Sequence, residues 1–385
     1  MKPTENFDYI ILGGGAAGLS LAYRMANDQY FFDKKIALIE KDQKNKNDRT
    51  WCFWERGAGP FEEVIVKRWK KLNFYSKTLE KKLDIGDYEY KMISGLSFYN
   101  YTLPKIKAAE NITYINAEVH SIDESGNEVV INTSSGDFKT PLIFKSYPSV
   151  GEIDKEKHLY VDQHFKGYVI TTEDPAFNAD EATFMDFRIP QEGDARFFYV
   201  LPISPTKALV EVAIFSNQLL KNEEYDQILA DYIKEYLRIE TYEIDEEEFG
   251  VIPMTTFPYM DHNTDRIFHI GTGGGVVKPS SGYAFKRIQE HSDLIIECLK
   301  DQKPLSRSYD GLKGRFLLYD KVMLHAMLKN GVSGEEIFTK LFKKKDASLI
   351  FKFLNQKTHF FEELSVFTAP PMWPFTKSFF TLISR

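Results

Sequence analysis

The stretch "DYIILGGGAAGLSLAYRMA", which runs from Asp8 to Ala26, decides how the first part of the chain folds. It opens with a short apolar strand, Tyr9 to Leu12, and three glycines follow directly. Beyond the glycines, Ala17, Leu21 and Met25 recur at the spacing of one helix face. The sequence therefore predicts a strand, a tight glycine turn and a helix in immediate succession.

The spacing of the glycines indicates which ligand this turn binds. Gly13, Gly15 and Gly18 form the pattern Gly-x-Gly-x-x-Gly, which permits a tight turn, a close approach of backbone to a pyrophosphate, and close packing of the helix. A second predicted strand, "IALIE", ends in Glu40, where an acid is expected to hold the ribose hydroxyls of an adenosine. A glycine turn without a ligand is the alternative, but the whole context favours a dinucleotide. The predicted binding residues in this part are Gly13, Gly15, Ala16, Ala17, Gly18, Glu40, Lys41 and Arg49.

A second glycine turn lies far downstream, in "DRIFHIGTGGGVVKPSSGYAFKRIQEHSDLI". The pattern predicts a strand over 267–270, a turn over 271–275, and a helix from about Ser281. FAD and NAD share the first turn, whereas a second turn that opens a helix offers further backbone N–H groups to a phosphate or a flavin ring. It favours FAD. The predicted contacts here are Gly271, Thr272, Lys278 and Gly282, with Lys278 able either to neutralise the charge of a reduced flavin or to act only in the structure.

The composition excludes several classes of function. The net charge of −7 argues against a nucleic-acid footprint, and the two cysteines form neither a zinc set nor a disulfide framework, so we expect no metal site. No apolar run approaches the roughly 20 residues of a membrane span, and no signal peptide precedes the first strand. We therefore expect a cytoplasmic protein without a transmembrane helix, at most peripheral at the inner face of the membrane.

The run "ALVEVAIF", Ala208 to Phe215, carries one acid inside an apolar strand. On a strand, Glu211 shares a face with Leu209 and Ala213, while Val210 and Val212 line the other. Both faces are apolar, so the carboxyl must either find a partner or stay protonated. A salt bridge to Arg196 or Arg188 is the structural alternative.

Several segments together resemble lycopene cyclases of the flavoprotein type over nearly the whole chain. The similar segments are "DRTWCFWE", "FMDFRIPQ", "RFFYVLPISPTKALVE", "GTGGGVVKPSSGY" and "PPMWPF". The resemblance implies a lycopene beta-cyclase, which closes the acyclic ends of lycopene into ionone rings, giving gamma-carotene and beta-carotene in carotenoid biosynthesis. It implies reduced FAD, maintained by NAD(P)H or another donor, as a stabiliser of the cationic transition state. The reaction involves no net redox change.

The resemblance also implies roles for two acids. Glu211 matches the first acid of the family's Glu-Asp/Glu-Thr segment and is the expected proton donor, but Val212 stands where a second acid often follows. Asp186 in "FMDFR" either orders the proton network or only pairs with Arg188. The aromatic residues Trp51, Phe53 and Trp54 either flank the polyene or belong to the core.

The expected fold class is α/β: a doubly wound, Rossmann-like FAD-binding domain with an antiparallel substrate-side sheet and a helical C-terminal part. We assign 1–75, 100–150 and 250–300 to the FAD-binding domain, 76–99 and 151–249 to the substrate-side sheet, and 301–385 to the helical region. The aromatic tail either contacts a bilayer or packs on the protein. An FAD-dependent monooxygenase or reductase acting on a polyene or prenyl chain, and a flavin-dependent carotenoid carrier, are the competing functions.

Overall fold

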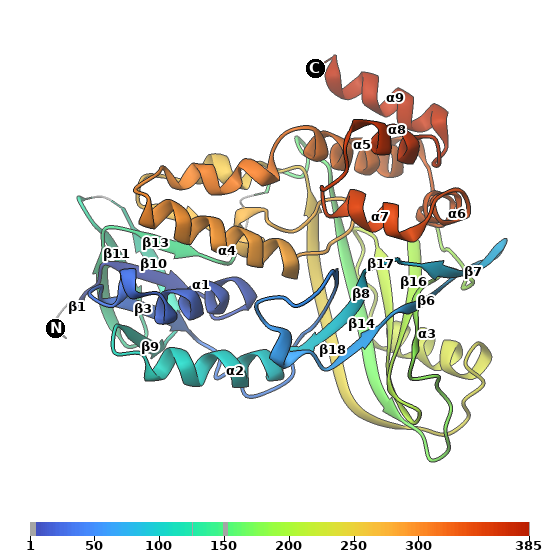
Figure 1. The fold of residues 1–385 in the computed structure, drawn as a ribbon, viewed down its shortest axis with the longest axis horizontal. Coiled ribbons are helices and arrows are strands. Elements are labelled where there is room, and N and C mark those ends of the chain that lie inside the picture. Colours follow the sequence, from blue (N-terminus) through green and yellow to red (C-terminus); the bar gives the residue numbers. More distant parts are fainter. Residues whose placement is uncertain (1–4, 125, 149–152, 385) are drawn as a thin grey trace. The chain divides into compact units, whose positions relative to one another are not determined.

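The computed structural model describes residues 5–124, 126–148 and 153–384, and Figure 1 shows their course. The chain divides into two compact units, each built from three separate segments. Unit 1 comprises 1–46, 95–158 and 256–317, and unit 2 comprises 47–94, 159–255 and 318–385. Each unit has its own sheet and its own core. The three-part division predicted from the sequence stays a prediction.

Unit 1 is built on a parallel sheet of five strands in the order β19-β13-β2-β3-β9. Parallel strands that are buried on both faces read as continuous apolar runs, as "YIIL" and "IALIE" do. The strands are β2 (Tyr9–Leu12), β3 (Ile36–Glu40), β9 (Ile112–Asn116), β13 (Ile143–Lys145) and β19 (Ile267–His269).

Different layers cover the two faces of this sheet. Helix α1 (Ala16–Asn27) contacts both α2 (Gly95–Ala108) and α4 (Phe285–Lys300), and these helices form one layer (Figure 1). A second, four-stranded sheet closes the other face, where Ile10, Ile39 and Ile131 share one buried cluster. Its strands are β1 (Glu5–Asn6), β10 (Val119–Asp123), β11 (Val129–Thr133) and β12 (Gly136–Thr140). The expected α/β fold is confirmed, and a sheet rather than a further helix layer covers this second face.

Unit 2 is built on a seven-stranded sheet in the order β18-β14-β17-β16-β15-β6-β7. All neighbouring pairs are antiparallel except β15 with β6. The strands are β6 (Lys71–Ser76), β7 (Leu79–Asp84), β14 (Tyr160–Thr171), β15 (Glu181–Asp186), β16 (Ala195–Ser204), β17 (Lys207–Phe215) and β18 (Glu243–Thr255). The expected antiparallel sheet is confirmed, and β16 and β17 form an antiparallel hairpin within it.

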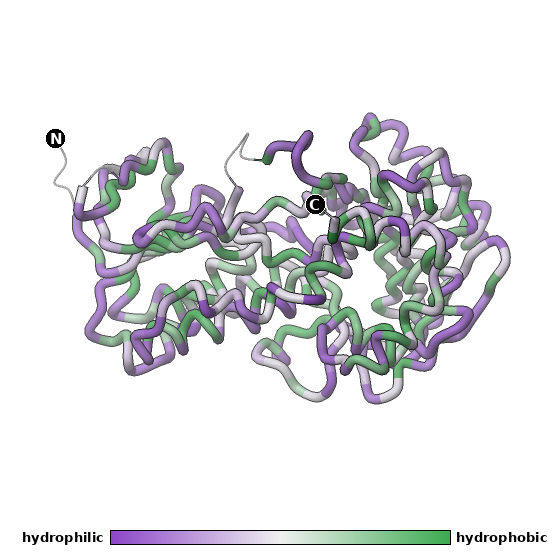
Figure 2. Tube along the Cα trace, turned by 90° about the horizontal axis from the view of Figure 1, so that it is seen from above, coloured by the Kyte–Doolittle hydropathy of each residue, from purple (hydrophilic) through white to green (hydrophobic). Residues whose placement is uncertain are grey.

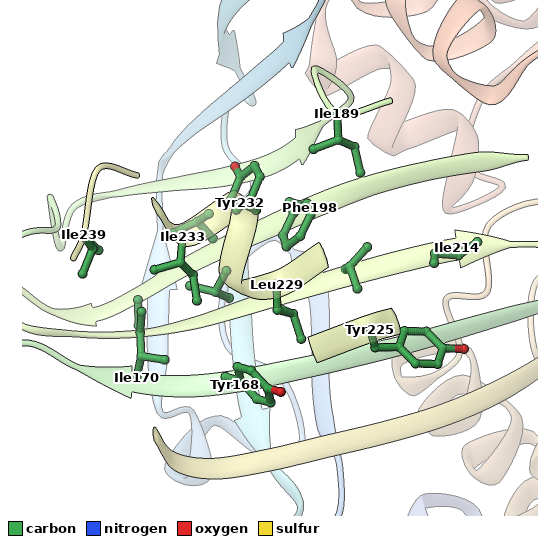
Figure 3. Close-up of a cluster of buried hydrophobic side chains, with 14 residues drawn as sticks. Tyr168, Ile170, Ile189, Phe198, Ile214, Tyr225, Leu229, Tyr232, Ile233 and Ile239 are labelled. Atoms are coloured by element: carbon green, nitrogen blue, oxygen red, sulfur yellow. The ribbon is translucent and has the colours of Figure 1, made fainter. Parts of the chain in front are cut away.

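One face of this sheet is sealed by helix α3 (Asn222–Glu235), whose Tyr225, Leu229 and Tyr232 lie over the strands in Figure 3. The cluster they enter includes Val210 and Val212 of β17, both fully buried. Because side chains alternate along a strand, Glu211 must point to the opposite face. The structure thus confirms the predicted division of β17 into two faces.

The rest of unit 2 is a small antiparallel sheet and a helical C-terminal region. The sheet has the order β4-β8-β5, with β4 (Thr50–Glu55), β5 (Lys67–Trp69) and β8 (Glu89–Ser94). The helices are α5 (Arg315–Asn330), α6 (Gly334–Lys344), α7 (Ala347–Leu354), α8 (Phe360–Phe367) and α9 (Met372–Ile383). The predicted helical C-terminal part is confirmed.

One prediction about local structure was wrong. The helix after the second glycine turn begins at Phe285, not near Ser281, because Gly282 has a φ of +73° and bonds back to Lys278 in a further turn. The acidic run from Asp245 to Glu248 lies within strand β18.

Hydrophobic and hydrophilic residues are interspersed along the chain, as Figure 2 shows. In the described part of the chain, no helix has both the length and the apolar character needed to cross a bilayer.

Candidate active site

The first glycine turn of unit 1 forms a cradle at the N-terminus of α1. Gly13 has a φ of +95°, and a Cβ added to Gly18 would lie 1.9 Å from the Gly13 carbonyl oxygen, so only glycine lets the helix approach the strand this closely. A Cβ added to Gly15 would meet nothing within 4 Å, which leaves open space in front of the helix.

Backbone donors face that open space. The first hydrogen bond of α1 runs from the Leu19 N–H to the Gly15 oxygen at 3.0 Å. Among the described residues, the N–H groups of Ala16, Ala17 and Gly18 have no acceptor, and no side chain caps the helix. Unpaired N–H groups at a helix N-terminus, together with the helix dipole, attract phosphate. The cradle therefore fits the pyrophosphate of a dinucleotide.

Glu40 ends β3 beside this turn. Its carboxylate accepts hydrogen bonds from the Gly14 N–H and from the Asp42 N–H, the latter at 2.8 Å. These bonds fix the carboxylate at the carboxyl end of the parallel sheet, where open α/β sheets bind their ligands. Its position fits a ribose acceptor.

The second glycine turn joins the first in unit 1. A Cβ added to Gly271, whose φ is +58°, would lie 2.6 Å from the Ala17 Cβ, so the second turn packs directly against the start of α1. Ser146, which directly follows β13, contacts both turns: its hydroxyl donates to the Leu12 carbonyl at 2.9 Å, and its carbonyl accepts from the Gly273 N–H at 3.3 Å. Two turns that are distant in the sequence therefore lie side by side in unit 1.

The other residues predicted to bind the cofactor have varied surroundings. Lys41 is exposed and lies 3.5 Å from Glu118, while Arg49, in unit 2, donates to the Phe249 carbonyl at 3.2 Å. Lys278 is buried, and its backbone N–H donates to the Tyr283 carbonyl at 3.0 Å. Thr272 belongs to the second turn itself. Contacts of these side chains with a flavin stay predictions.

In unit 2, three neighbouring strands bring two acids onto one face of the sheet. Gly167 of β14 lies opposite Glu211 of β17 on one side and opposite Glu248 of β18 on the other. Directly opposed residues of a sheet point to the same face. The two acids therefore flank Gly167, which has no side chain to separate them.

The two carboxyl groups interact. Burial raises the pKa of the Glu211 carboxyl well above its ordinary value, and the charge and hydrogen bonding of Glu248 raise this pKa further. Glu211 keeps some accessible surface, whereas Glu248 is only 8% exposed. Burial and the neighbouring acid therefore both favour the protonated form of the Glu211 carboxyl.

Within the described residues, Glu211 makes no salt bridge to either of the two candidate arginines. Arg188 pairs with Asp186, and Arg196 pairs with Asp194. The structural alternative predicted for Glu211, a salt bridge to either arginine, is therefore wrong. In its place Glu211 has an acid as its neighbour.

Apolar and aromatic side chains surround this face of the sheet. Tyr199 of β16 lies opposite Glu211, and its ring is 6.3 Å from that of Phe184. Phe184 also contacts Tyr90 at 5.3 Å and Trp54 at 6.4 Å between ring centroids. Trp54 stacks on Phe351 of α7, which supports a core role for it. Aromatic faces of this kind can stabilise a nearby cation.

Asp186 lies on the other face of the sheet. It is opposite Phe198, which stacks on Tyr232 of α3 with ring centroids 3.7 Å apart. The Asp186 carboxylate accepts from Arg188 Nε at 2.9 Å and from the Tyr232 hydroxyl at 2.7 Å, and it is fully buried. This arrangement favours the second of the two predicted alternatives, a structural pair with Arg188.

The sequence prediction missed Glu248. Glu248 is the last of four consecutive acids, a pattern that is typical of a solvated segment. The first three, Asp245, Glu246 and Glu247, are indeed exposed, and only the register of β18 with β14 turns Glu248 inward. The one local signal is the apolar segment "FGVIPM" that follows, which marks a strand. Nothing in the sequence indicates that this strand lies two places from β17.

These features define a class of protein. A parallel sheet with two glycine turns and a large antiparallel sheet also make up the fold of solved flavin-dependent enzymes. A flavin-dependent brominase superposes with a TM-score of 0.64 at 12% identity over 98% of each chain. A geranylgeranyl bacteriochlorophyll reductase-like protein from Thermoplasma acidophilum superposes with 0.62 at 13% identity, covering 100% of this chain and 97% of the other.

Within that class, the family is established by sequence. The lycopene cyclase protein family model matches residues 8–379, and the chain belongs to this family. A lycopene beta-cyclase of a Paracoccus species is 25% identical, with 95% of each chain covered. That of Pantoea ananas is 22% identical over 74% of this chain and 72% of the relative. Potato neoxanthin synthase, also 22% identical, is covered over 60% of its length and matches 76% of this chain.

Proposed function

We propose that this chain is a lycopene beta-cyclase that closes the acyclic ends of lycopene into ionone rings without a net redox change. The observation that carries the proposal is the raised pKa of Glu211 on an aromatic-lined face of the unit 2 sheet. An alkene is a weak base, so its protonation requires a carboxylic acid that is still protonated when the substrate binds. The family match supports lycopene as the substrate.

The residues of unit 1 fit FAD. The N–H groups of Ala16, Ala17 and Gly18 would hold the pyrophosphate, and Glu40 would accept the ribose hydroxyls. Thr272, Lys278 and Gly282 of the second turn are proposed contacts of the flavin. When it is bound and reduced by NAD(P)H, FAD supplies an electron-rich ring that stabilises positive charge.

The residues of unit 2 handle the proton. The Glu211 carboxyl donates its proton to the terminal double bond of the polyene, an internal double bond attacks the resulting cation, and a proton is then lost. The surrounding rings of Tyr199, Phe184 and Tyr90 exclude water, which would otherwise capture the cation. The proposed acid is thus placed where its proton has few competing acceptors.

We also propose that helices α8 and α9 contact a bilayer, where the apolar substrate dissolves. Large apolar side chains stay exposed there, among them Phe361 at 76%, Trp373 at 77% and Met372 at 65%. Exposed aromatic residues favour the membrane interface. Replacing Phe361 and Trp373 by serine should reduce flotation with liposomes. Replacing Phe32 of unit 1, which is 57% exposed, should not.

The test of the function is product analysis. Purified protein is incubated anaerobically with lycopene in liposomes, FAD and NADPH, and the products are separated and weighed by mass spectrometry. Ring products of unchanged mass that require reduced flavin are expected. Consumption of NAD(P)H in step with a change of mass would instead indicate a monooxygenase or reductase, and bound carotenoid without turnover would indicate a carrier.

A further inference from the structure

The arrangement of three strands explains how the two acids of unit 2 meet. β17 and β18 are separated by β14, so their backbones lie about 10 Å apart across two strand spacings. A Cβ added to Gly167 of β14 would lie 3.1 Å from the Glu211 Cβ and 3.3 Å from its Cγ. The glutamate side chain therefore leans over the glycine, toward Glu248 on the far side. Only a residue without a side chain leaves this path open.

Glu248 has an environment that differs from that of its neighbours on β18. Asp245 lies 2.6 Å from Lys207, Glu246 accepts from the Asn47 amide at 2.6 Å, and Glu247 is 3.8 Å from Lys166. Glu248 is 8% exposed, and its Oε2 has no hydrogen-bond partner within the described ranges. A buried carboxylate oxygen without a donor is costly. A structural salt bridge does not account for Glu248.

We propose that Glu248 is a positioning residue for Glu211, and that the two carboxyl groups hold one proton between them. This inference rests on the proposed function for its use in the reaction, since Glu211 is the proposed acid. Two carboxylates that share a low-dielectric site cannot easily both ionise, so one proton is retained. Glu248 thus fills the role left open at Val212, but from another strand.

Other titratable and charged groups face the pair. They are the Cys52 thiol of β4, the hydroxyl of Tyr90, which bonds to that thiol, Tyr199 of β16, and Arg49 just before β4. Burial and the two acids raise the pKa of Cys52, so its thiol stays neutral. The Arg49 guanidinium packs against Gly250 and donates to the Phe249 carbonyl. It is a cation on this side of β18.

The pair of carboxyl groups donates one proton and regains one in each turnover. The O–H bond of Glu211 breaks as a C–H bond forms at the terminal double bond of the substrate, and the pair then holds two negative charges. Ring closure is followed by loss of one proton from the ring cation. One proton returns to the pair, so substrate and enzyme end with the protons they began with, and no oxidant or reductant is consumed.

The test compares Glu248→Gln with Glu247→Gln. The second variant is the control, because it removes a carboxylate from the adjacent residue of β18, whose side chain points to the opposite face of the sheet. In substrate-free protein, infrared spectroscopy follows the C=O band of the protonated carboxyl as a function of pH. Removing the Glu248 charge should lower the pKa of Glu211 by about one unit or more, and Glu247→Gln should leave it unchanged. The high-pH limb of kcat should move by the same amount.

The outcomes separate the two proposals. An unchanged infrared midpoint in Glu248→Gln overturns the pair, even if cyclisation is intact. A shifted midpoint in a protein that forms no rings supports the pair and refutes the cyclase. Glu248→Asp keeps the carboxylate but moves it back by one methylene group. Its infrared midpoint and its kcat should therefore lie between those of Glu248→Gln and those of wild type. Failure of Glu248→Asp to differ from Glu248→Gln also counts against a shared proton.

Discussion

The cradle of unit 1 and the acid pair of unit 2 are both built at β-strands, but they use the chain in opposite ways. The cradle uses backbone N–H groups from residues that follow one another, at Ala16 to Gly18. The pair uses two side chains from strands that are brought together only by β14. A site made of backbone can be recognised from a short motif. A site made by strand register cannot, because its members have no fixed spacing in the sequence.

The largest expected effect concerns the pair. Glu211→Gln keeps the shape but removes the transferable proton, so kcat for cyclisation should fall by about 10²- to 10⁴-fold. FAD affinity should not change, because the cradle is made of backbone in unit 1. Product analysis and flavin titration together measure both. Activity within tenfold of wild type would remove Glu211 from the mechanism and leave the family assignment intact.

We expect alanine substitutions at two glycines of the cradle, Gly18 and Gly15, to have different effects. The Cβ of Gly18→Ala would clash with the Gly13 carbonyl, so this variant should lose both stability, by about 1–3 kcal/mol, and FAD binding. The Cβ of Gly15→Ala would enter the open space, so it should weaken FAD binding with an unchanged melting temperature. Thermal melts without FAD, followed by flavin titration, distinguish the two. Normal FAD affinity in Gly15→Ala would show that the cofactor does not lie there.

A smaller effect tests the spacing within the pair. In Gly167→Ala the new methyl group would lie 3.0 Å from Leu209 Cδ1 and 3.1 Å from the Glu211 Cβ, so the acid must shift by a few tenths of an ångström. Misplacement on this scale should lower kcat by about tenfold, with KM nearly unchanged. Gly311→Ala, where a Cβ meets nothing within 4 Å, is the control. Equal kinetics in the two variants would refute the predicted role of Gly167.

The smallest effect is on stability as a function of pH. The folded-state pKa of Glu211 lies above the ordinary value of 4.5, so the folded protein binds more protons than the unfolded chain. The stability contributed by the protonated group is therefore present at pH values below 4.5 and is lost as the pH rises toward the folded pKa. The slope is at most about 1.4 kcal/mol per pH unit. Denaturant unfolding at several pH values should therefore show that the difference in unfolding free energy between wild type and Glu211→Gln changes with pH by up to this slope.

The parts of the molecule that could be predicted from the sequence are those whose causes are local. The strand, turn and helix around Gly13 follow from adjacent residues, and the strand of Glu211 follows from its apolar run. The alternation of that strand also predicts correctly that Val210 and Val212 share the other face. These features depend on side-chain periodicity, which is visible without the fold.

The parts that could not be predicted depend on pairing over long distances. Glu248 is turned inward by the register of β18 with β14, although its neighbours are exposed. The placement of Asp186 with Tyr232 requires knowledge of which sheet face α3 covers. The start of α4 was misjudged by a few residues because Gly282 allows a positive φ that extends the turn. Each error arose where tertiary contacts overrode a local pattern.

The central position of β14 has a consequence for how related chains can diverge. Each acid of the pair is held by its own ladder to β14, so the length of the segment that connects β17 to β18 does not set their pairing. Insertions or deletions in the loops of that segment would change the sequence distance between Glu211 and Glu248 while leaving them face to face. A one-residue insertion within β18 itself would turn the second acid outward. An evolutionary search for the partner acid in relatives should therefore compare strand alignments rather than residue spacing.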